Sequence, residues 1–364
     1  MAYNATLGAP GAVNSTGDRA ALYLKVFAGE VLATFEESNV MKALHTIRTI
    51  ASGKSAQFIV TGAATSRYHT PGQSLLEPAN LANKLGNEAN TGTADPYLST
   101  IPSNERVISI DKLLTSSAFM DDLDAAMSQW DIRSTYAKEI GKELSKQFDI
   151  NCINTVIGCS RASATITGGK TGGAVTHANI GTDADELLDR IAEAAQKLDE
   201  NDVSDSDRYL ILRPEQYWLL LNDSSATTRS HLVNRDYTAG NGDIAKGTLM
   251  QAFGFTIFKS NHIPTDVAVT ADTGGRADPG VTTPFSGNDV YGSVGEASGY
   301  HGDTAKTVGL AFHKSAIGTV KLLDLSVQSD YLVSHQGSLL VARYAMGHNY
   351  LRPEAAIELR TAAE

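Results

Sequence analysis

One long apolar stripe, between Ser116 and Ile157, dominates the pattern of hydrophobic and polar positions. Its members recur at steps of three or four residues, or of seven where Ser134 interrupts the stripe, which is the spacing along one face of an α-helix. No proline breaks the segment, and Ser116 or Ser117 suits the N-cap position. The pattern predicts a single helix, roughly 60 Å long at about 1.5 Å per residue. The stripe consists of Phe119, Leu123, Met127, Trp130, Ala137, Ile140, Leu144, Phe148 and Cys152.

A helix of this length is as long as a compact chain of 364 residues should be wide. The expected radius of gyration is ~21 Å, which corresponds to a globule on the order of 50 Å across. We therefore expect a flat or extended subunit. The large surface of such a subunit is most economically buried against copies of itself.

A long hairpin is the second unusual feature. Ala56–Thr61 and Arg106–Asp111 have the composition of strands, and the segment between them is rich in Gly, Pro, Asn, Ser and Thr. Loops longer than about 12–15 residues are uncommon inside a compact domain. If the two strands pair, they form the base of a hairpin that projects from the body.

Helical and strand patterns alternate after a Gly/Thr-rich linker at 162–181, which predicts a separate α/β lobe. The segment 266–306 is poor in large apolar residues and is expected to be a surface insertion loop. Near the N-terminus, Asp18–Phe35 reads as an amphipathic helix. The expected downstream elements are a helix that starts at Thr182 with Asp185 in a capping box, strand Arg208–Leu212, a helix from Pro214 to about Leu221, strand Phe253–Lys259, and closing strands Val308–His313, Thr319–Val327 and Leu339–Tyr344.

Composition and charge limit the function classes. Charged residues make up 20% and hydrophobic residues 42%, so the chain is not globally disordered. The net charge of −11 argues against a nucleic-acid-binding surface, although it is compatible with lying beside a polyanion. No apolar run reaches 18 residues, so no membrane span is expected.

The two cysteines, Cys152 and Cys159, are seven positions apart. On a helix they would lie about 10 Å apart along the axis, which exceeds the ~4.4–6.8 Å Cα separation of a disulfide. We expect reduced, structural thiols in a reducing cytoplasm. The sequence contains no CxxC pair, so no metal site and no cofactor are expected.

Two GK[ST] triplets, 53–55 and 169–171, invite interpretation as phosphate-binding loops. Such a loop needs a glycine five residues before its GK, but Arg48 and Ala164 occupy those positions. Catalytic motifs such as HExxH and GxSxG are absent from the sequence. No catalytic residue is predicted.

The histidines and the acidic residues at 199–207 are expected to be structural. His313, His335 and His348 lie beside apolar strand patterns and should be packed or hydrogen-bonded rather than ligands. The acidic cluster lacks the central glycine and final glutamate of an EF-hand, so a solvated loop fits better than a calcium site.

Five segments, spread from the N-terminal region to the C-terminus in family order, resemble the major capsid protein of short-tailed podoviruses, which has the Hong Kong 97-type shell fold. The resemblance covers nearly the whole chain. The segments are LKVFAGEVLATF (24–35), SGKSAQF (52–58), ERVISIDKLL (105–114), HKSAIGTVKLLDL (313–325) and YAMGHNYLRPEAA (344–356).

The resemblance implies an α+β fold whose parts map onto the predicted elements. They are an N-terminal arm (1–53), an E-loop hairpin (54–110), a P-domain with a long spine helix (111–180), an A-domain (181–313), and a return to the P-domain with the C-terminus (314–364).

Two segments, 81–103 and 266–306, exceed the family pattern, so no contacts can be assigned to them by resemblance.

The resemblance also implies function. It predicts a structural subunit, not an enzyme, that self-assembles as pentamers and hexamers into an icosahedral phage head enclosing double-stranded DNA. The implied partners are a separate scaffold protein, because no long charged helical prefix precedes the arm, a portal protein, and packaged DNA nearby without sequence-specific binding. Assembly is expected in the host bacterial cytoplasm, and the product is the virion.

Two alternatives stay open at this point: an encapsulin-like bacterial shell that encloses cargo enzymes, and a nucleotide-binding enzyme that uses the GK[ST] triplets.

Candidate inter-subunit contacts fall in the hairpin and on the long helix. The helix set is a basic stripe at four-residue steps, which is either an exposed face or a contact with carboxylates of a neighbour. The candidates are Lys54, Arg67, Tyr68, His69 and Glu77 in the hairpin, and Lys138, Lys142 and Lys146 on the helix.

Overall fold

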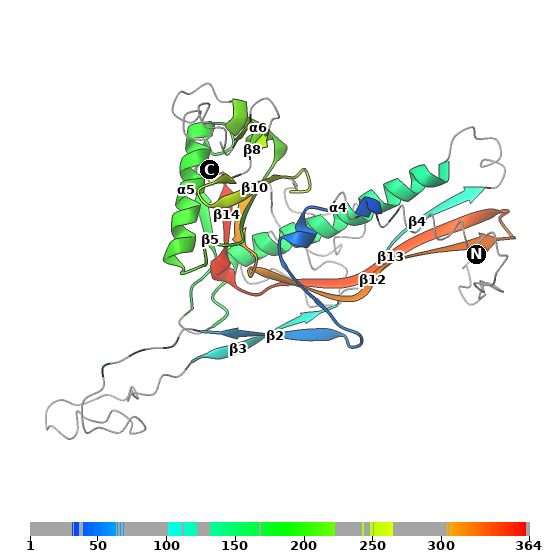
Figure 1. Cartoon of the computed structure of the whole chain (residues 1–364), viewed down its shortest axis with the longest axis horizontal. Helices are drawn as coiled ribbons and strands as arrows, with labels where there is room; N and C mark the ends of the chain where they lie inside the picture. The colour runs from blue at the N-terminus through cyan, green and yellow to red at the C-terminus, as the bar shows by residue number, and fades with distance from the viewer. Residues whose placement is uncertain are drawn as a thin grey trace, which may run out of the picture.

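The chain forms an elongated subunit with a compact lobe at one end and a long helix that lies along a sheet (Figure 1). The computed structural model describes residues 31, 33–35, 39–62, 64, 66, 68, 101–110, 113–121, 132–166, 169–222, 242–243, 248–249, 251–264, 304 and 306–361. The expectation of an extended rather than globular subunit is therefore confirmed.

The long helix, α4, spans Ile132–Arg161 and contains 30 residues, so it is about 45 Å long. The expected helix start at Ser116 is wrong, because Leu114–Asp121 is a strand, β4. Residues of β4 pair with β13 (Gly337–Tyr350), for example Phe119 with Leu339. At the other end, the helix continues four residues beyond the expected Ile157. Residues 122–131, which carry part of the predicted stripe, lie outside the described residues.

A four-stranded sheet supports α4. Its order is β1-β12-β13-β4, with β1 parallel to β12 and the other neighbours antiparallel. The strands predicted at 319–327 and 339–344 are confirmed, but β12 and β13 are 16 and 14 residues long, far beyond the usual ~5–6. This hairpin follows α4 along its length (Figure 1). The remaining elements of this part are η1 (Met41–Ala43), β1 (Thr46–Thr49) and β12 (Ile317–Leu332).

A six-stranded sheet forms the compact lobe, in the order β5-β14-β11-β6-β10-β9. Helix α5 packs on β5 and β14, and α6 packs on α5. The predicted helices are confirmed, although Asp183 rather than Thr182 caps α5, by accepting a hydrogen bond from Asp185 N at 3.0 Å. The predicted linker at 162–181 contains β5. The elements are β5 (Gly173–Thr176), α5 (Ala184–Glu200), β6 (Arg208–Leu212), α6 (Pro214–Asn222), β9 (Gln251–Ala252), β10 (Phe255–Lys259), β11 (Thr307–His313), η2 (Pro353–Ala355) and β14 (Ala356–Arg360).

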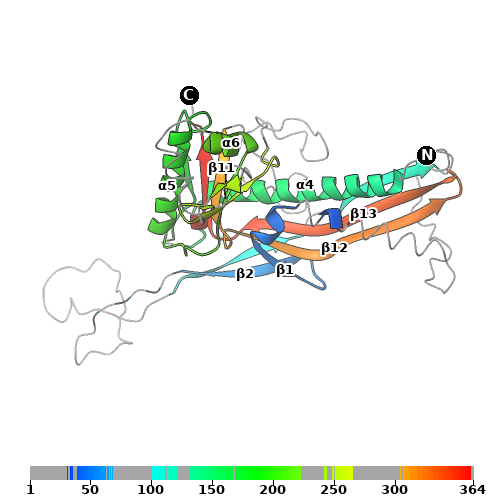
Figure 2. The ribbon, with the colours of Figure 1, turned by 45° about the horizontal axis from the view of Figure 1, so that its top comes forward.

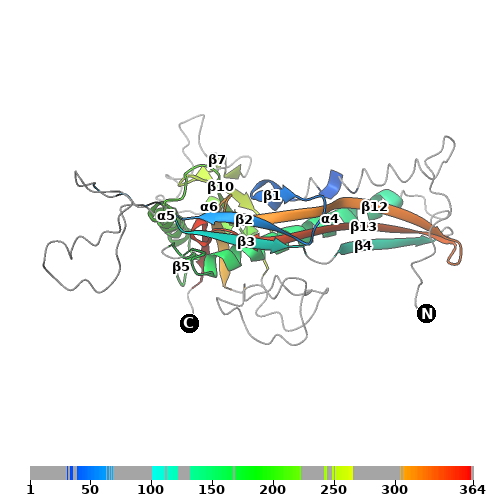
Figure 3. The same ribbon diagram turned by 90° about the horizontal axis from the view of Figure 1, so that it is seen from below.

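The predicted hairpin base is confirmed. Strands β2 (Ser55–Thr61) and β3 (Ser103–Ser109) pair antiparallel over their full length. In Figures 2 and 3 they run side by side from the four-stranded sheet towards the end of the molecule that carries α5. A Cβ at Gly347 of β13 would lie 2.0 Å from the carbonyl oxygen of Ser109, so glycine is required for this approach. The base of the hairpin is thus fixed against β13.

Three further expectations fall largely outside the described residues. Of the predicted helix at 18–35, Val31 and residues 33–35 are described and are helical. The insertion loop at 266–306 is described only at Thr304 and Lys306. One short strand pair, β7 (Gly242–Asp243) with β8 (Thr248–Leu249), completes the described structure.

Candidate inter-subunit surfaces and the buried spine network

The first half of α4 is amphipathic. Ala137, Ile140 and Leu144 are buried against the sheet. The three lysines of the predicted basic stripe, Lys138, Lys142 and Lys146, are exposed on the outer side of the helix. Lys142 pairs with Glu139 at 2.9 Å, but both side chains are more than half exposed, so this pair contributes little to the stability of the subunit.

The predicted contacts in the hairpin are only partly described. Lys54 is exposed just before β2, and its carbonyl oxygen accepts a hydrogen bond from Ile110 N at 2.8 Å. Tyr68 is fully exposed. Arg67, His69 and Glu77 lie outside the described residues. The described hairpin candidates and the lysine stripe belong to different elements of the subunit.

The sequence interpretation missed a set of exposed apolar side chains on the strands. Ile59 on β2 is 80% exposed, and Val333 at the end of the β12–β13 hairpin is 70% exposed. On the four-stranded sheet, three further side chains are each more than two fifths exposed: Leu323, Tyr331 and Phe119. Such side chains indicate a contact with another protein only where they form a contiguous patch, and these are spread over two sheets. Strand alternation within 317–332 was the signal that could have revealed part of this set.

The second half of α4 is buried almost all round, because it lies between the two sheets: it contacts β13 and β12 of one and β14, β5 and β11 of the other. Asp149 is fully buried there. Its carboxylate accepts hydrogen bonds from Val40 N at 3.1 Å, from Met41 N at 3.0 Å and from His262 Nδ1 at 2.8 Å. One helix residue therefore holds the N-terminal segment and the loop after β10.

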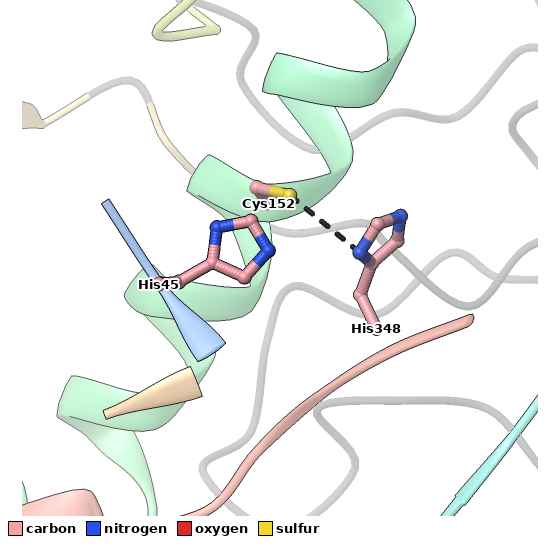
Figure 4. Close-up of side chains that lie close together, drawn as sticks. All are labelled: His45, Cys152 and His348. Atoms are coloured by element: carbon pink, nitrogen blue, oxygen red, sulfur yellow. Dashed lines mark hydrogen bonds between the residues drawn. The ribbon is translucent and has the colours of Figure 1, made fainter. Parts of the chain in front are cut away.

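A buried network of two histidines, a threonine and a cysteine lies one turn further along α4, and Figure 4 shows its histidines and its cysteine. His45 Nδ1 donates to the carbonyl oxygen of Met41 at 2.7 Å, and His45 Nε2 lies 2.6 Å from Thr319 Oγ1. Thr319 Oγ1 is 2.8 Å from His348 Nδ1. Cys152 Sγ lies 3.5 Å from the same nitrogen.

The protons of this network follow from its geometry. Because His45 Nδ1 carries a hydrogen, its Nε2 accepts the single hydroxyl hydrogen of Thr319, and His348 Nδ1–H then donates to Thr319 Oγ1. Burial lowers the pKa of His45 to about 4, although the hydrogen bond to Met41 opposes this. Burial, and then the neighbouring His45, lowers the pKa of His348 to about 3. Burial, and then Asp149, raises the pKa of Cys152 well above its usual value, so the thiol is protonated.

Neither GK[ST] triplet is a phosphate-binding loop. Such a loop leads into a helix, whereas the first triplet leads into β2 and the second into β5. Lys170 donates to the carbonyl oxygen of Glu200 and lies 3.8 Å from the carboxylate of Asp202. Lys170 therefore contacts the C-terminal end of α5. The motif on which the nucleotide-binding alternative was based is not a phosphate-binding loop.

The acidic cluster at 199–207 surrounds an arginine. Arg208 is only 4% exposed, and its guanidinium lies 2.7 Å from Asp199 and 2.9 Å from Asp205. Asp205 itself is 92% exposed. The cluster is thus solvated and ion-paired, as expected, although Asp199 and Glu200 are the last residues of α5 and only the rest form a loop.

In the part of the chain that the structure describes, no helix combines the length and the apolar character needed to cross a membrane.

Comparison with known proteins identifies the family. A family model described as "Gp10A-like: Major capsid protein" matches residues 87–360. The major capsid protein of Escherichia phage T7 is 32% identical over 355 residues, which cover 94% of this chain and 93% of the relative. The major capsid protein of Enterobacteria phage T3 is 30% identical over 357 residues, which cover 94% of this chain and 92% of the relative.

A solved structure supports the same assignment. The capsid structure of the cyanophage P-SCSP1u superposes with a TM-score of 0.67 at 30% identity, covering 90% of this chain and 89% of that chain. The expected α+β, Hong Kong 97-type capsid fold is confirmed, and the relatives are structural proteins rather than enzymes. A match of this extent, in sequence and in fold, shows that the chain belongs to the Gp10A-like family of major capsid proteins.

Proposed function

We propose that this shell-forming subunit assembles as pentamers and hexamers into an icosahedral phage head that encloses double-stranded DNA. The observation that supports this best is the shape of the subunit. The helix α4 and the β12–β13 hairpin make a long, thin body, and a second hairpin leads away from it on a base of only two strands. Such a body can cover a wide area of shell only with neighbours on all sides.

We also propose the division of the chain into an N-terminal arm (1–53), an E-loop (54–110), a P-domain (111–180 with 314–364) and an A-domain (181–313). In this scheme the E-loop lies over a neighbouring subunit. Lys54 and Tyr68 belong to that contact, together with Arg67, His69 and Glu77. The exposed stripe of Lys138, Lys142 and Lys146 faces carboxylates of another copy.

The proposed partners are a separate scaffold protein during assembly, a portal protein at one vertex, and the packaged DNA. A net charge of −11 suits a wall that encloses DNA without gripping it. Assembly takes place in the host bacterial cytoplasm in this proposal.

The experiment is expression of the full chain with and without the scaffold protein of the same phage, followed by sedimentation and electron microscopy. Closed particles of many subunits that depend on the scaffold are expected. Recovery of only monomers or dimers under all assembly conditions would contradict the proposal. Particles that close without a scaffold and retain a co-expressed enzyme instead of nucleic acid would favour the encapsulin-like alternative.

A further inference from the structure

We propose that His45, Cys152 and His348 form a binding site for one zinc-like divalent cation inside the subunit. This inference is independent of the proposed function, because it concerns the core of a single chain. The three residues come from three elements: the segment between η1 and β1, the buried half of α4, and the last part of β13. All three are buried.

The ligand types and their spacing fit zinc. Two imidazole nitrogens and one cysteine sulfur are donors that Zn²⁺ binds, at about 2.0–2.1 Å and about 2.3 Å respectively. A tetrahedron with these bond lengths has an N···S edge of about 3.6 Å. The observed distance from Cys152 Sγ to His348 Nδ1 is 3.5 Å. His45, Cys152 and His348 each place a donor atom within 4.8 Å of the other two, so small side-chain rotations complete the site.

The surroundings already orient one ligand. His45 Nδ1 donates to the carbonyl oxygen of Met41 at 2.7 Å, which fixes the tautomer and leaves the Nε2 lone pair facing the cluster. A ring nitrogen held by a backbone carbonyl is the usual outer-shell arrangement of a zinc-binding histidine. In Figure 4, the rings of His45 and His348 flank Cys152.

The Thr319 hydroxyl borders the site. Its Oγ1 lies 2.6 Å from His45 Nε2 and 2.8 Å from His348 Nδ1, where it joins the two rings by hydrogen bonds. These bonds describe the site without a cation. When a cation binds, the Cys152 thiol loses its proton to solvent and the hydrogen of His348 moves from Nδ1 to Nε2. The Thr319 hydroxyl keeps its hydrogen and gives up its bonds to the two coordinating nitrogens, and a water takes the fourth position.

The charge of the cation is also accommodated. Cys152 contributes one negative charge as thiolate, and the fully buried carboxylate of Asp149 lies three residues earlier on the same side of α4. Asp149 accepts hydrogen bonds from Val40 N and Met41 N, so it is already directed towards the segment that carries His45. A bound cation would therefore join three segments that are far apart in sequence, with 196 positions between Cys152 and His348.

Cobalt substitution provides the test, because Co²⁺ bound to a thiolate gives a ligand-to-metal charge-transfer absorption. The full chain is refolded with Co²⁺ or Zn²⁺, freed of excess metal by gel filtration, and analysed for metal content. One cation per subunit with a thiolate charge-transfer band is expected. The Cys152→Ser variant should lose the band, and His45→Gln or His348→Gln should weaken binding by on the order of ten-fold or more.

Cys159 provides a matched control. It is equally buried on α4, but its sulfur hydrogen-bonds to the carbonyl oxygens of Ala316 and Arg352 and lies outside the cluster. Cys159→Ser should keep the metal and the band. Wild-type protein that refolds without binding either ion, or Cys152→Ser protein that keeps the band, would overturn the proposal. If Cys152→Ser does not fold, the wild-type spectrum decides, because a bound cobalt without thiolate absorption also overturns it.

Discussion

The guanidinium of Arg161, the last residue of α4, donates two hydrogen bonds of 2.7 Å to the carboxylate of Glu358 on β14. Glu358 is fully buried and the Arg161 side chain is only 11% exposed. The Thr307 hydroxyl also donates to Glu358, at 2.5 Å. This planar, two-bond pair joins the end of the spine helix to the six-stranded sheet, so it links the two cores of the subunit.

Removing one partner of this pair should be strongly destabilising. Among the described residues, Arg161→Met leaves the buried Glu358 carboxylate with Arg360, whose Nε lies 3.6 Å away, as its remaining cation. We expect a loss of about 3–5 kcal/mol in the free energy of unfolding, because the buried carboxylate loses both charge-assisted hydrogen bonds and Arg360 lies too far away to replace them. Urea unfolding of the unassembled subunit measures it. The exposed Lys142–Glu139 pair is the control, since Lys142→Met should cost about 0–1 kcal/mol. Equal effects of the two changes would contradict this view of the Arg161 pair.

Acid should destabilise the buried histidine network. The pKa values of about 4 for His45 and about 3 for His348 lie below the 6.5 of an unfolded histidine, so only the unfolded chain takes up these protons between pH 6.5 and 4. The contribution to stability is therefore complete above pH 6.5 and falls as the pH decreases, by about 1.4 kcal/mol per pH unit for each histidine.

Urea unfolding at several pH values, with EDTA present so that no cation contributes, tests this expectation. A His45→Gln/His348→Gln variant should show a flatter pH dependence than the wild type over this window. His335→Gln, on an exposed turn, is the control and should follow the wild-type curve. The same slope in all three proteins would refute the assignment.

The hydrophobic pattern was sufficient to predict helices whose apolar residues recur regularly and whose first residues carry a start signal such as a proline or a cap. Pro214 opens α6 as expected, and Leu187, Leu188 and Ile191 are buried on α5. The pattern failed at β4, because the spacing of Phe119 in the helical stripe is accidental. In β4, Phe119 is 43% exposed while its neighbour Met120 is buried, and the hydrogen bonds of both come from β13, a partner that lies far along the chain.

The buried network around His45, Thr319 and His348 could not be predicted from the sequence for the same physical reason. His45 and Thr319 are 274 positions apart, and the parallel pairing of β1 with β12 brings them together. His348 is packed and hydrogen-bonded, as expected, but the proposed cation site departs from the expectation that it is not a ligand. Nothing in its sequence context named its partners. The lysine stripe was easier to place, because four-residue steps on a helix predict one exposed face.

A substitution that usually stabilises a helix should do the opposite at Gly141. Glycine to alanine in a helix interior normally gains about 1 kcal/mol. At Gly141, however, a Cβ would lie 2.9 Å from the carbonyl oxygen of Val31 and 3.1 Å from the Cβ of Thr34. Val31 and Phe35 are buried in the same core as α4, so their helical segment cannot shift without loss of packing.

We expect Gly141→Ala to lose about 1–3 kcal/mol and to increase hydrogen exchange around residues 31–35. Glu143→Ala, on the exposed side of the same helix, should leave that exchange unchanged. A Gly141→Ala protein that is more stable than the wild type would show that the segment does not rest against α4 as described.

Reversing the charge of the lysine stripe should affect assembly rather than folding. Changing Lys138, Lys142 and Lys146 to Glu alters only exposed positions, so each change should shift the free energy of unfolding by about 0.5 kcal/mol, and the three together by about 1–2 kcal/mol. If the stripe faces carboxylates of a neighbour, the triple Glu variant should assemble poorly and the triple Gln variant should be intermediate, with both defects depending on salt. Sedimentation at two ionic strengths measures this. Particle yields equal to wild type would leave the stripe as a merely exposed face.

Replacing residues 68–102 by a short Gly/Ser linker should separate the folding of the subunit from its assembly. The replacement keeps β2 and β3, whose buried residues Ala56 and Ile108 pack with Val320 and Ala345 of the four-stranded sheet. Shortening the connection changes the closure entropy by only fractions of a kcal/mol, so circular dichroism and urea unfolding should remain close to wild type. If the hairpin lies over a neighbouring subunit as proposed, the replacement removes buried area from that contact, and a shell repeats the loss at each subunit. Ile108→Ala is the contrasting variant, because it leaves the tip intact and removes a fully buried side chain at the base, at a cost of about 2–5 kcal/mol to the subunit itself.

We therefore expect a stable subunit without shells from the linker variant and a destabilised subunit from Ile108→Ala. Shells of wild-type stability from the linker variant, or its failure to fold, would mean that the hairpin is not an intermolecular clasp.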